Sequence, residues 1–329
     1  MMIAYDVVTL GETMIRLSPP GMARIEAAHS FEIVIGGSES NTAVGIARLG
    51  GQVCWLSRLT DNALGRSITG ALAHHGVDTA RVTWTDADRV GVYFYEPAPA
   101  PRGGRVIYDR AGSALSRMTP ADLPIDLFQP GAARLLHLTG ITPAVGAGAV
   151  AATARDLAKR AGWRLSFDVN YRSKLWSPAD ALAGCLPYMA MADLVLIGYG
   201  DAQTFYGVTG VTTPDAALDR VAQDAPTALV VMTLGADGAI ARLPDGSIVA
   251  QAAFPSQEVG RLGGGDAFAA GFLYRWLQDD APTAASIGEA LRWGTACAAL
   301  KYGMPGDMPI IDRADVLALV EGDAGGLRR

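Results

Sequence analysis

Short apolar segments typical of buried β-strands alternate with helical segments along most of the chain, and this alternation limits the folds available to it. Strands are predicted at 6–11, 53–59, 134–140, 164–170, 193–198 and 228–235, and helices at 40–50, 62–75 and 147–161. Strands and helices in alternation form βαβ units, whose parallel sheet is covered by helices on both faces. The sequence therefore predicts an α/β fold with a doubly wound, mostly parallel sheet and with ligands at the carboxyl ends of its strands.

Two regions interrupt this alternation. Residues 12–35 and 88–110 contain no convincing helix, and the second region carries the β-branched and aromatic segments "VGVYFYE" and "RVIYDR". They predict a small β lid on a single domain spanning 1–329. After residue 263 the chain is nearly all helical, with helices expected at 266–278, 284–301 and 312–321. Because an open sheet exposes strand edges, we expect the lid to form contacts in a homo-oligomer, a dimer or higher.

Composition excludes several classes of protein. The 329 residues are 50% hydrophobic and 18% charged, with a net charge of -6 and no run of basic residues, which argues against nucleic-acid and membrane partners. No signal peptide or membrane span is evident, so a cytoplasmic protein is expected. Cys54, Cys185 and Cys297 lie far apart, without a CxxC pair, and are expected to be buried. The four histidines include no HExxH pattern, so a histidine metal site is not indicated.

The stretch "RLGGGDAFAAGF" (261–272) places three glycines and an aspartate before an apolar helical run. Glycines can turn several N–H groups toward one point, and the first turn of a helix adds unpaired N–H groups of its own. Such a loop attracts an anion. Asp266 is expected at the N-cap or in the first turn, where an ordinary capping role is the simpler alternative.

Other glycine motifs separate into weak and specific ones. A P-loop, GxxxxGK[ST], is absent from the sequence. The segment "GAGAVA" (146–151) is similar to a dinucleotide-binding fingerprint, but Pro143 separates it from the preceding strand, and it is interpreted as a helix start. The segment "GGSESNTAVGIARLGG" (36–51) is a glycine turn followed by Ser and Asn at the start of a helix that ends in glycine.

The last motif and "GGGDAFAAG", in this order, resemble the paired signatures of the ribokinase (PfkB-type) family of carbohydrate kinases. The resemblance covers nearly the whole chain. Within the family it is closest to the 2-keto-3-deoxygluconate kinases, at "TLGETMIRLSP", "RVIYDRAGSALS", "HLTGITPA", "DVNYRSKLWSP" and "YGMPGDMP". It implies a ribokinase-like fold and an ATP-dependent kinase acting on a small-molecule sugar acid.

The resemblance also implies roles for the glycine loop. Asp266 corresponds to the family's catalytic base, and the N–H groups of Gly263, Gly264 and Gly265 to its anion hole for the γ-phosphate. Pre-aimed N–H dipoles stabilise the charge that spreads over the transferring phosphoryl oxygens. A carboxylate at a helix N-terminus is expected to have a depressed pKa, so positioning by Asp266 should matter more than its basicity.

Substrate and nucleotide residues follow from the same resemblance. The substrate pocket corresponds to Gly37, Asn41, Tyr93, Tyr108, Arg110, Arg172 and Asp307. Arg172 follows a strand end and can bind a carboxylate through two parallel hydrogen bonds, although an ion pair with Asp168 is an alternative. The turn "TLGADG" assigns Thr233, Gly235 and Gly238 to ATP, and it also reads as a strand–turn–strand hairpin. Mg²⁺ is implied by ATP, and no metal ligand is assigned.

Three departures from the family pattern involve four positions. Gly198 and Asp201 stand where Asn-x-x-Glu usually organises the metal's water shell, and Gly260 stands where the family's monovalent-cation site usually has aspartate. Asp109 replaces a common tyrosine and is expected to make the pocket more acidic. Three hypotheses therefore stay open: a 2-keto-3-deoxygluconate kinase, a kinase for another sugar acid or a ketose such as fructose, and a non-catalytic sugar- or nucleotide-binding relative.

Overall fold

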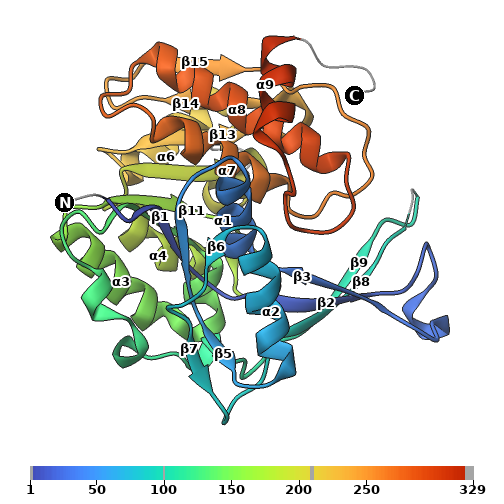
Figure 1. Ribbon diagram of the computed structural model, residues 1–329. Coiled ribbons are helices and arrows are strands. Elements are labelled where there is room, and N and C mark those ends of the chain that lie inside the picture. The colour runs from blue at the N-terminus through green and yellow to red at the C-terminus, as the bar shows by residue number, and fades with distance from the viewer. Residues whose placement is uncertain (1–2, 99–100, 208–210, 323–329) are drawn as a thin grey trace.

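A large sheet with helices on both faces forms the body of the protein, and a smaller sheet extends from one side (Figure 1). The computed structural model describes residues 3–98, 101–207 and 211–322. Strands β13 to β6 run parallel, whereas β14 and β15 form an antiparallel edge. The strand order is β15 (Ile248–Gln251), β14 (Ala239–Arg242), β13 (Leu229–Thr233), β12 (Leu194–Gly198), β11 (Arg164–Asp168), β10 (Ala133–Thr139), β1 (Tyr5–Leu10), β4 (Val53–Leu56) and β6 (Val77–Asp78).

The parallel strands are apolar on both faces, because each face carries its own core. Val7 and Val8 of β1 are both fully buried, yet they point into different hydrophobic clusters, as expected from the two-residue repeat of a strand. Over Val7 lie α1 (Ser38–Arg48), α2 (Ala63–His74), α7 (Gly264–Trp276) and α8 (Ala284–Tyr302). Over Val8 lie α3 (Gly148–Arg160), α4 (Pro178–Met189), α5 (Tyr199–Tyr206) and α6 (Pro214–Asp224). Helix α9 (Arg313–Glu321) packs on α8.

The predicted α/β architecture is confirmed, with local differences. The strand predicted at 53–59 divides at Ser57 into β4 and β5 (Arg58–Thr60), which pairs with β7 (Thr83–Thr85). The segment 146–151 continues a π-helical turn, Pro143–Ala147, into α3, as a helix start. Cys54, Cys185 and Cys297 are buried free thiols. Among the described residues, no helix combines the length and hydropathy needed to cross a membrane.

The predicted lid is a four-stranded sheet that reaches away from the body (Figure 1). Its order is β3 (Glu32–Gly36), β2 (Met14–Ser18), β8 (Val92–Glu96) and β9 (Arg105–Asp109). Register places Ile33, Leu17, Phe94 and Ile107 in one row across the sheet. The next row, which has the opposite orientation, contains Arg16, Tyr93 and Tyr108. One lid face therefore carries an apolar row, and the other carries a row that is polar and aromatic.

The apolar lid face generates a prediction about assembly. Ile33 and Ile107 are 68% and 40% exposed, which favours burial of this face against a second copy of the chain. We expect a dimer or higher oligomer in sedimentation velocity at micromolar concentration, and a shift to monomer in the double variant Ile33→Asp/Ile107→Asp. A wild-type protein that sediments as a monomer would contradict this prediction.

Candidate active site

The carboxyl ends of the parallel strands meet at one edge of the sheet, beneath the lid. Strands β10, β11, β12 and β13 end there at Thr139, Asp168, Gly198 and Thr233. The N-terminal turns of α1 and α7 face this edge, and their first residues contact each other through side-chain hydrogen bonds. This is the position at which open α/β sheets bind ligands.

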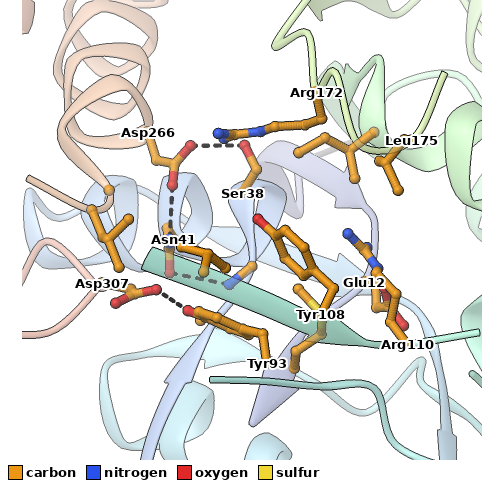
Figure 2. A pocket seen from close by; sticks show the side chains of 17 residues that line it. Glu12, Ser38, Asn41, Tyr93, Tyr108, Arg110, Arg172, Leu175, Asp266 and Asp307 are labelled. Carbon is orange, nitrogen blue, oxygen red and sulfur yellow. Dashed lines mark hydrogen bonds and ion pairs between the residues drawn. The ribbon is translucent and has the colours of Figure 1, made fainter. Parts of the chain in front are cut away.

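Three cavities at this edge contain every site residue predicted from the sequence. The first lies under the lid (Figure 2) and is lined by Gly37, Asn41, Tyr93, Tyr108, Arg110, Arg172, Gly263, Asp266 and Asp307 among others. The second, of about 570 Å³, lies between the β13–β14 turn, α7 and α8, and its lining includes Thr233, Gly235, Gly238, Gly264 and Gly265. The third shares residues with both, including Arg172, Gly263, Gly264 and Asp266. The glycine loop and Asp266 therefore lie where the other two cavities meet.

The three glycines of the loop differ in their surroundings. Gly263 has a φ of +82°, and a Cβ there would lie 1.9 Å from the carbonyl oxygen of Asp307. A Cβ at Gly264 would come within 2.9 Å of the Tyr302 ring. Around Gly265 no atom lies within 4 Å of the ideal Cβ position, and this residue borders open cavity space. The loop thus presents bare backbone to the cavities.

Asp266 is in the first turn of α7 and does not cap this helix. The N-cap is Gly263, and the Asp266 carboxylate accepts hydrogen bonds from Ser38 Oγ and Asn41 Nδ2, both at 2.7 Å (Figure 2). These donors belong to the first turn of α1, 225 or more residues earlier in the chain. The ordinary capping alternative is therefore wrong, and the carboxylate instead joins two helix N-termini.

The pKa of Asp266 is raised, whereas its place at a helix N-terminus led us to expect a lowered pKa. Burial raises the pKa of this carboxyl above its ordinary value, and the hydrogen bonds from Asn41 and Ser38 oppose the shift without reversing it. A helix N-terminus favours the charged form, but the desolvation of a 7% exposed carboxyl outweighs it. Asp266 is therefore a stronger proton acceptor than its position in the helix suggests.

Most charged groups around the first cavity are already paired. Asp307 forms an ion pair with Arg16 and accepts a hydrogen bond from Tyr93 Oη. Arg110 donates to Glu12 through its Nε, at 2.8 Å, and both side chains are nearly buried. Buried pairs of this kind hold geometry, since loss of one partner leaves an uncompensated charge.

Arg172 is the exception among these groups. It is exposed to the cavities, follows the carboxyl end of β11, and lies above Ser38 with its guanidinium close to the Asp266 side chain in Figure 2. Within the described part of the chain its guanidinium forms no hydrogen bond or ion pair, so the alternative of an ion pair with Asp168 is not observed. Its charge opposes the rise in the pKa values of Asp168, Asp201 and Asp266, but no hydrogen bond occupies its guanidinium, which is therefore available to a ligand.

Several residues of the site were missed in the sequence. Asn170 Nδ2 donates to Ser38 Oγ at 2.7 Å, and this hydroxyl in turn donates to Asp266. Asn170 has a φ of 39°, which ends β11 and turns its side chain toward α1. Only Asn, Asp and Gly adopt such a φ readily, so "DVNYR" carried a signal for Asn170. The sequence contained no such signal for Ser38, Glu12 and Arg16, apart from their positions near motifs.

The expectation for Asp109 is wrong. It does not line the first cavity, whereas its neighbours Tyr108, on β9, and Arg110, just after β9, do. An ion pair with Arg89 at 2.8 Å lowers the pKa of the exposed Asp109 carboxyl. Asp109 therefore does not make the pocket more acidic.

Asp168 and Asp201 add two further carboxyl groups to the third cavity. Burial, followed by the charges of Asp266 and Asp201, raises the pKa of Asp168 to about 8. Asp201 lies in the first turn of α5, whose N-cap is Gly198. Its Oδ2 accepts a hydrogen bond from the Tyr171 N–H at 3.2 Å, and burial raises its pKa as well. The described residues contain no group of three or more side chains with metal-ligand spacing. This donor set fits a Mg²⁺ ion held mostly by phosphates and water, with carboxylates in its outer shell.

Comparisons with known proteins agree with this geometry of two cavities joined at a glycine loop. Residues 4–312 match the pfkB family of carbohydrate kinases. The chain is 39% identical over 326 residues to the 2-dehydro-3-deoxygalactonokinase of Haloferax volcanii, covering 98% of this chain and 99% of the relative.

Two solved structures extend the comparison. The 2-dehydro-3-deoxygluconokinase of Thermotoga maritima superposes with a TM-score of 0.87 at 28% identity, covering 98% of this chain and 100% of that one. Fructokinase of Vibrio cholerae, bound to fructose, ADP and calcium ion, superposes with a TM-score of 0.82 at 26% identity, covering 96% of this chain and 99% of that one. The fold and site thus define a sugar kinase. The chain belongs to the pfkB family of carbohydrate kinases.

The raised pKa of Asp168 predicts a pH-dependent stability in Mg²⁺-free buffer. Between the ordinary carboxyl pKa and about 8, native Asp168 keeps a proton that the unfolded chain has lost, so the free energy of unfolding should fall as pH rises. The slope for one such group is up to about 1.4 kcal/mol per pH unit. Chemical denaturation from pH 5 to 9 should show a shallower fall in Asp168→Asn than in wild type. Equal slopes in Asp168→Asn and the exposed control Asp86→Asn would contradict the assignment.

Proposed function

We propose that this kinase transfers the γ-phosphoryl group of ATP to a hydroxyl of a 2-keto-3-deoxy sugar acid. The candidate substrates are 2-keto-3-deoxygluconate and its epimer 2-keto-3-deoxygalactonate. Relatives named for each compound match almost the whole chain, at 28% identity for the gluconate and 39% for the galactonate enzyme. The proposal commits to the acid class, and a side-by-side assay separates the two epimers.

One observation carries the choice of an acid. Among the charged side chains that line the first cavity, Glu12 and Arg110 are paired together, and Asp307 is paired with Arg16. Asp266 accepts two neutral hydrogen bonds, so Arg172 is left as the one unpaired cation of the described lining. A carboxylate matches a guanidinium fork, whereas a neutral sugar gives it no charge to bind.

The proposed chemistry places Asp266 at the acceptor hydroxyl. As the hydroxyl oxygen forms its bond to the γ-phosphorus, the bond from that phosphorus to the ADP oxygen breaks, and the hydroxyl proton passes to Asp266. The raised pKa of the buried carboxyl favours this transfer. Ser38 and Asn41 fix the orientation of the carboxylate, and Asn170 fixes Ser38. Held this way, the base loses little entropy in the reaction.

The glycine loop is proposed to hold the transferring group. Its N–H groups lie at the start of α7, and they are aimed by a backbone that only glycine permits at position 263. Thr233, Gly235 and Gly238 line the second cavity and are proposed to contact ATP. Asp168 and Asp201 would hold Mg²⁺ through its water shell. When bound, Mg²⁺ supplies neutralisation of phosphate charge.

The other hypotheses are weaker on specific grounds. A ketose kinase such as the Vibrio cholerae fructokinase shares the fold, but a neutral ketose would leave Arg172 unpaired in a closed site. A non-catalytic relative would have no need for a buried carboxylate held by two donors next to a glycine loop. Asp201 stands where the usual Asn-x-x-Glu motif has its glutamate, so a carboxyl group is still present at the third cavity.

Arg172 provides the test of the substrate class. ATP consumption should be measured with both 2-keto-3-deoxy acids and with fructose, and wild type should favour an acid by at least tenfold in kcat/KM. Arg172→Ala should lower kcat/KM for the acid by about 2 to 4 kcal/mol in transition-state free energy, as expected for loss of a buried charged contact. Arg172→Lys should recover part of this loss, because an ammonium cannot form the fork.

Two controls accompany this experiment. Arg81, which forms an exposed ion pair with Asp126 at 2.7 Å, lies outside all three cavities, and Arg81→Ala should behave as wild type. Any residual activity toward fructose should change little in Arg172→Ala. Equal losses for acid and ketose, or a wild type that prefers fructose, would refute the sugar-acid proposal.

A further inference from the structure

Arg261 precedes the glycine loop and borders two of the three cavities, but no role has yet been assigned to it. It lies two residues before Gly263 and lines the second and third cavities. The next residue, Leu262, lines the first and third cavities instead. Leu262 therefore borders the sugar cavity, Arg261 borders the nucleotide cavity, and both border the third cavity.

The nucleotide cavity needs positive charge and has one source of it. The other residues that line the second cavity are small, apolar, hydroxyl-bearing or aromatic, and the only charged ones in the described chain are Glu258 and Arg261. The adjoining third cavity contains the carboxyl groups of Asp168, Asp201 and Asp266, and its other cation, Arg172, also borders the sugar cavity. A triphosphate carries several negative charges into these surroundings. Backbone N–H dipoles of the glycine loop supply only partial charge against them.

Arg261 has only one weak side-chain contact among the described residues. Its Nε lies 3.5 Å from Glu258 Oε2, and the two side chains are 75% and 56% exposed. An exposed ion pair of this length contributes little stability, so a stronger anion can replace the carboxylate. Phosphate oxygens accept two parallel hydrogen bonds from a guanidinium and carry more charge than Glu258.

We propose that Arg261 binds the phosphates of ATP, and that Glu258 holds its guanidinium at the cavity mouth until the nucleotide arrives. This inference rests on the proposed function in that ATP is the phosphoryl donor. Arg172 and Arg261 then flank the reaction centre from opposite sides. Arg172 serves the carboxylate of the acceptor, and Arg261 serves the phosphates of the donor.

Nucleotide binding to variants tests this proposal without any sugar present. Isothermal titration calorimetry should compare ATP with Mg²⁺ against adenosine, which has the base and ribose but no phosphate. Arg261→Gln should weaken ATP binding at least tenfold and leave adenosine binding within twofold of wild type. Glu258→Gln should tighten ATP binding two- to fivefold, because Arg261 no longer has to leave a carboxylate. Arg81→Gln is the matched control and should change neither ligand.

The outcomes separate this inference from the proposed function. ATP binding within twofold of wild type in Arg261→Gln would overturn the inference alone, and so would an equal loss of ATP and adenosine, which indicates damage to the cavity. Weaker ATP binding in Glu258→Gln would show that Glu258 is itself a nucleotide contact and would overturn the exchange of partners. A wild-type protein that binds no ATP would overturn the proposed function together with this inference.

Discussion

The buried carboxylate of Asp266 is the constraint around which the site is arranged. Its two donors, Ser38 and Asn41, begin α1, whereas Asp266 begins α7, so the interaction joins segments from opposite ends of the chain. A buried carboxylate without these hydrogen bonds would cost several kcal/mol. The packing of α1 on α7 and the exact start of each helix therefore serve the same group. Asn170 extends the arrangement to the end of β11.

The charges of the site show a division between structural and available groups. Arg16, Glu12, Arg110 and Asp307 are paired and nearly buried, and they tie the lid strands to the body of the protein. Arg172 and Arg261 are exposed, and Arg261 has only a long contact with Glu258. Burial raises the pKa values of the Asp168, Asp201 and Asp266 carboxyls, and for Asp168 the nearby charges of Asp266 and Asp201 add to the shift. Such an arrangement favours binding of cations and of cation-bearing phosphates.

The sequence predicted the fold, and the residues that it assigned to the site lie around the same three cavities, whereas the hydrogen bonds and pKa values inside these cavities were not predictable. Strand periodicity and glycine motifs are local properties, so β1, β10 and the loop at 263–265 could be located without coordinates. The pKa direction of Asp266 depends on burial, which is set by packing between distant segments, and the helix dipole alone gave the wrong sign. The partners of Arg110 and Asp307 depend on lid register in the same way. The prediction that Asp109 makes the pocket more acidic was wrong, because the face of β9 on which Asp109 lies is fixed only by the pairing of β9 with β8.

The most direct test of the central claim is the single-turnover rate of Asp266→Asn, measured together with its affinities for ATP and the preferred sugar acid. The substitution keeps the shape of the side chain but removes the proton acceptor and its charge. The account predicts a loss of phosphoryl-transfer rate of at least about a thousandfold, within the range for general-base removal, with both affinities within about threefold of wild type. A rate within tenfold of wild type, with both ligands bound normally, would show that another group accepts the proton and would contradict the account.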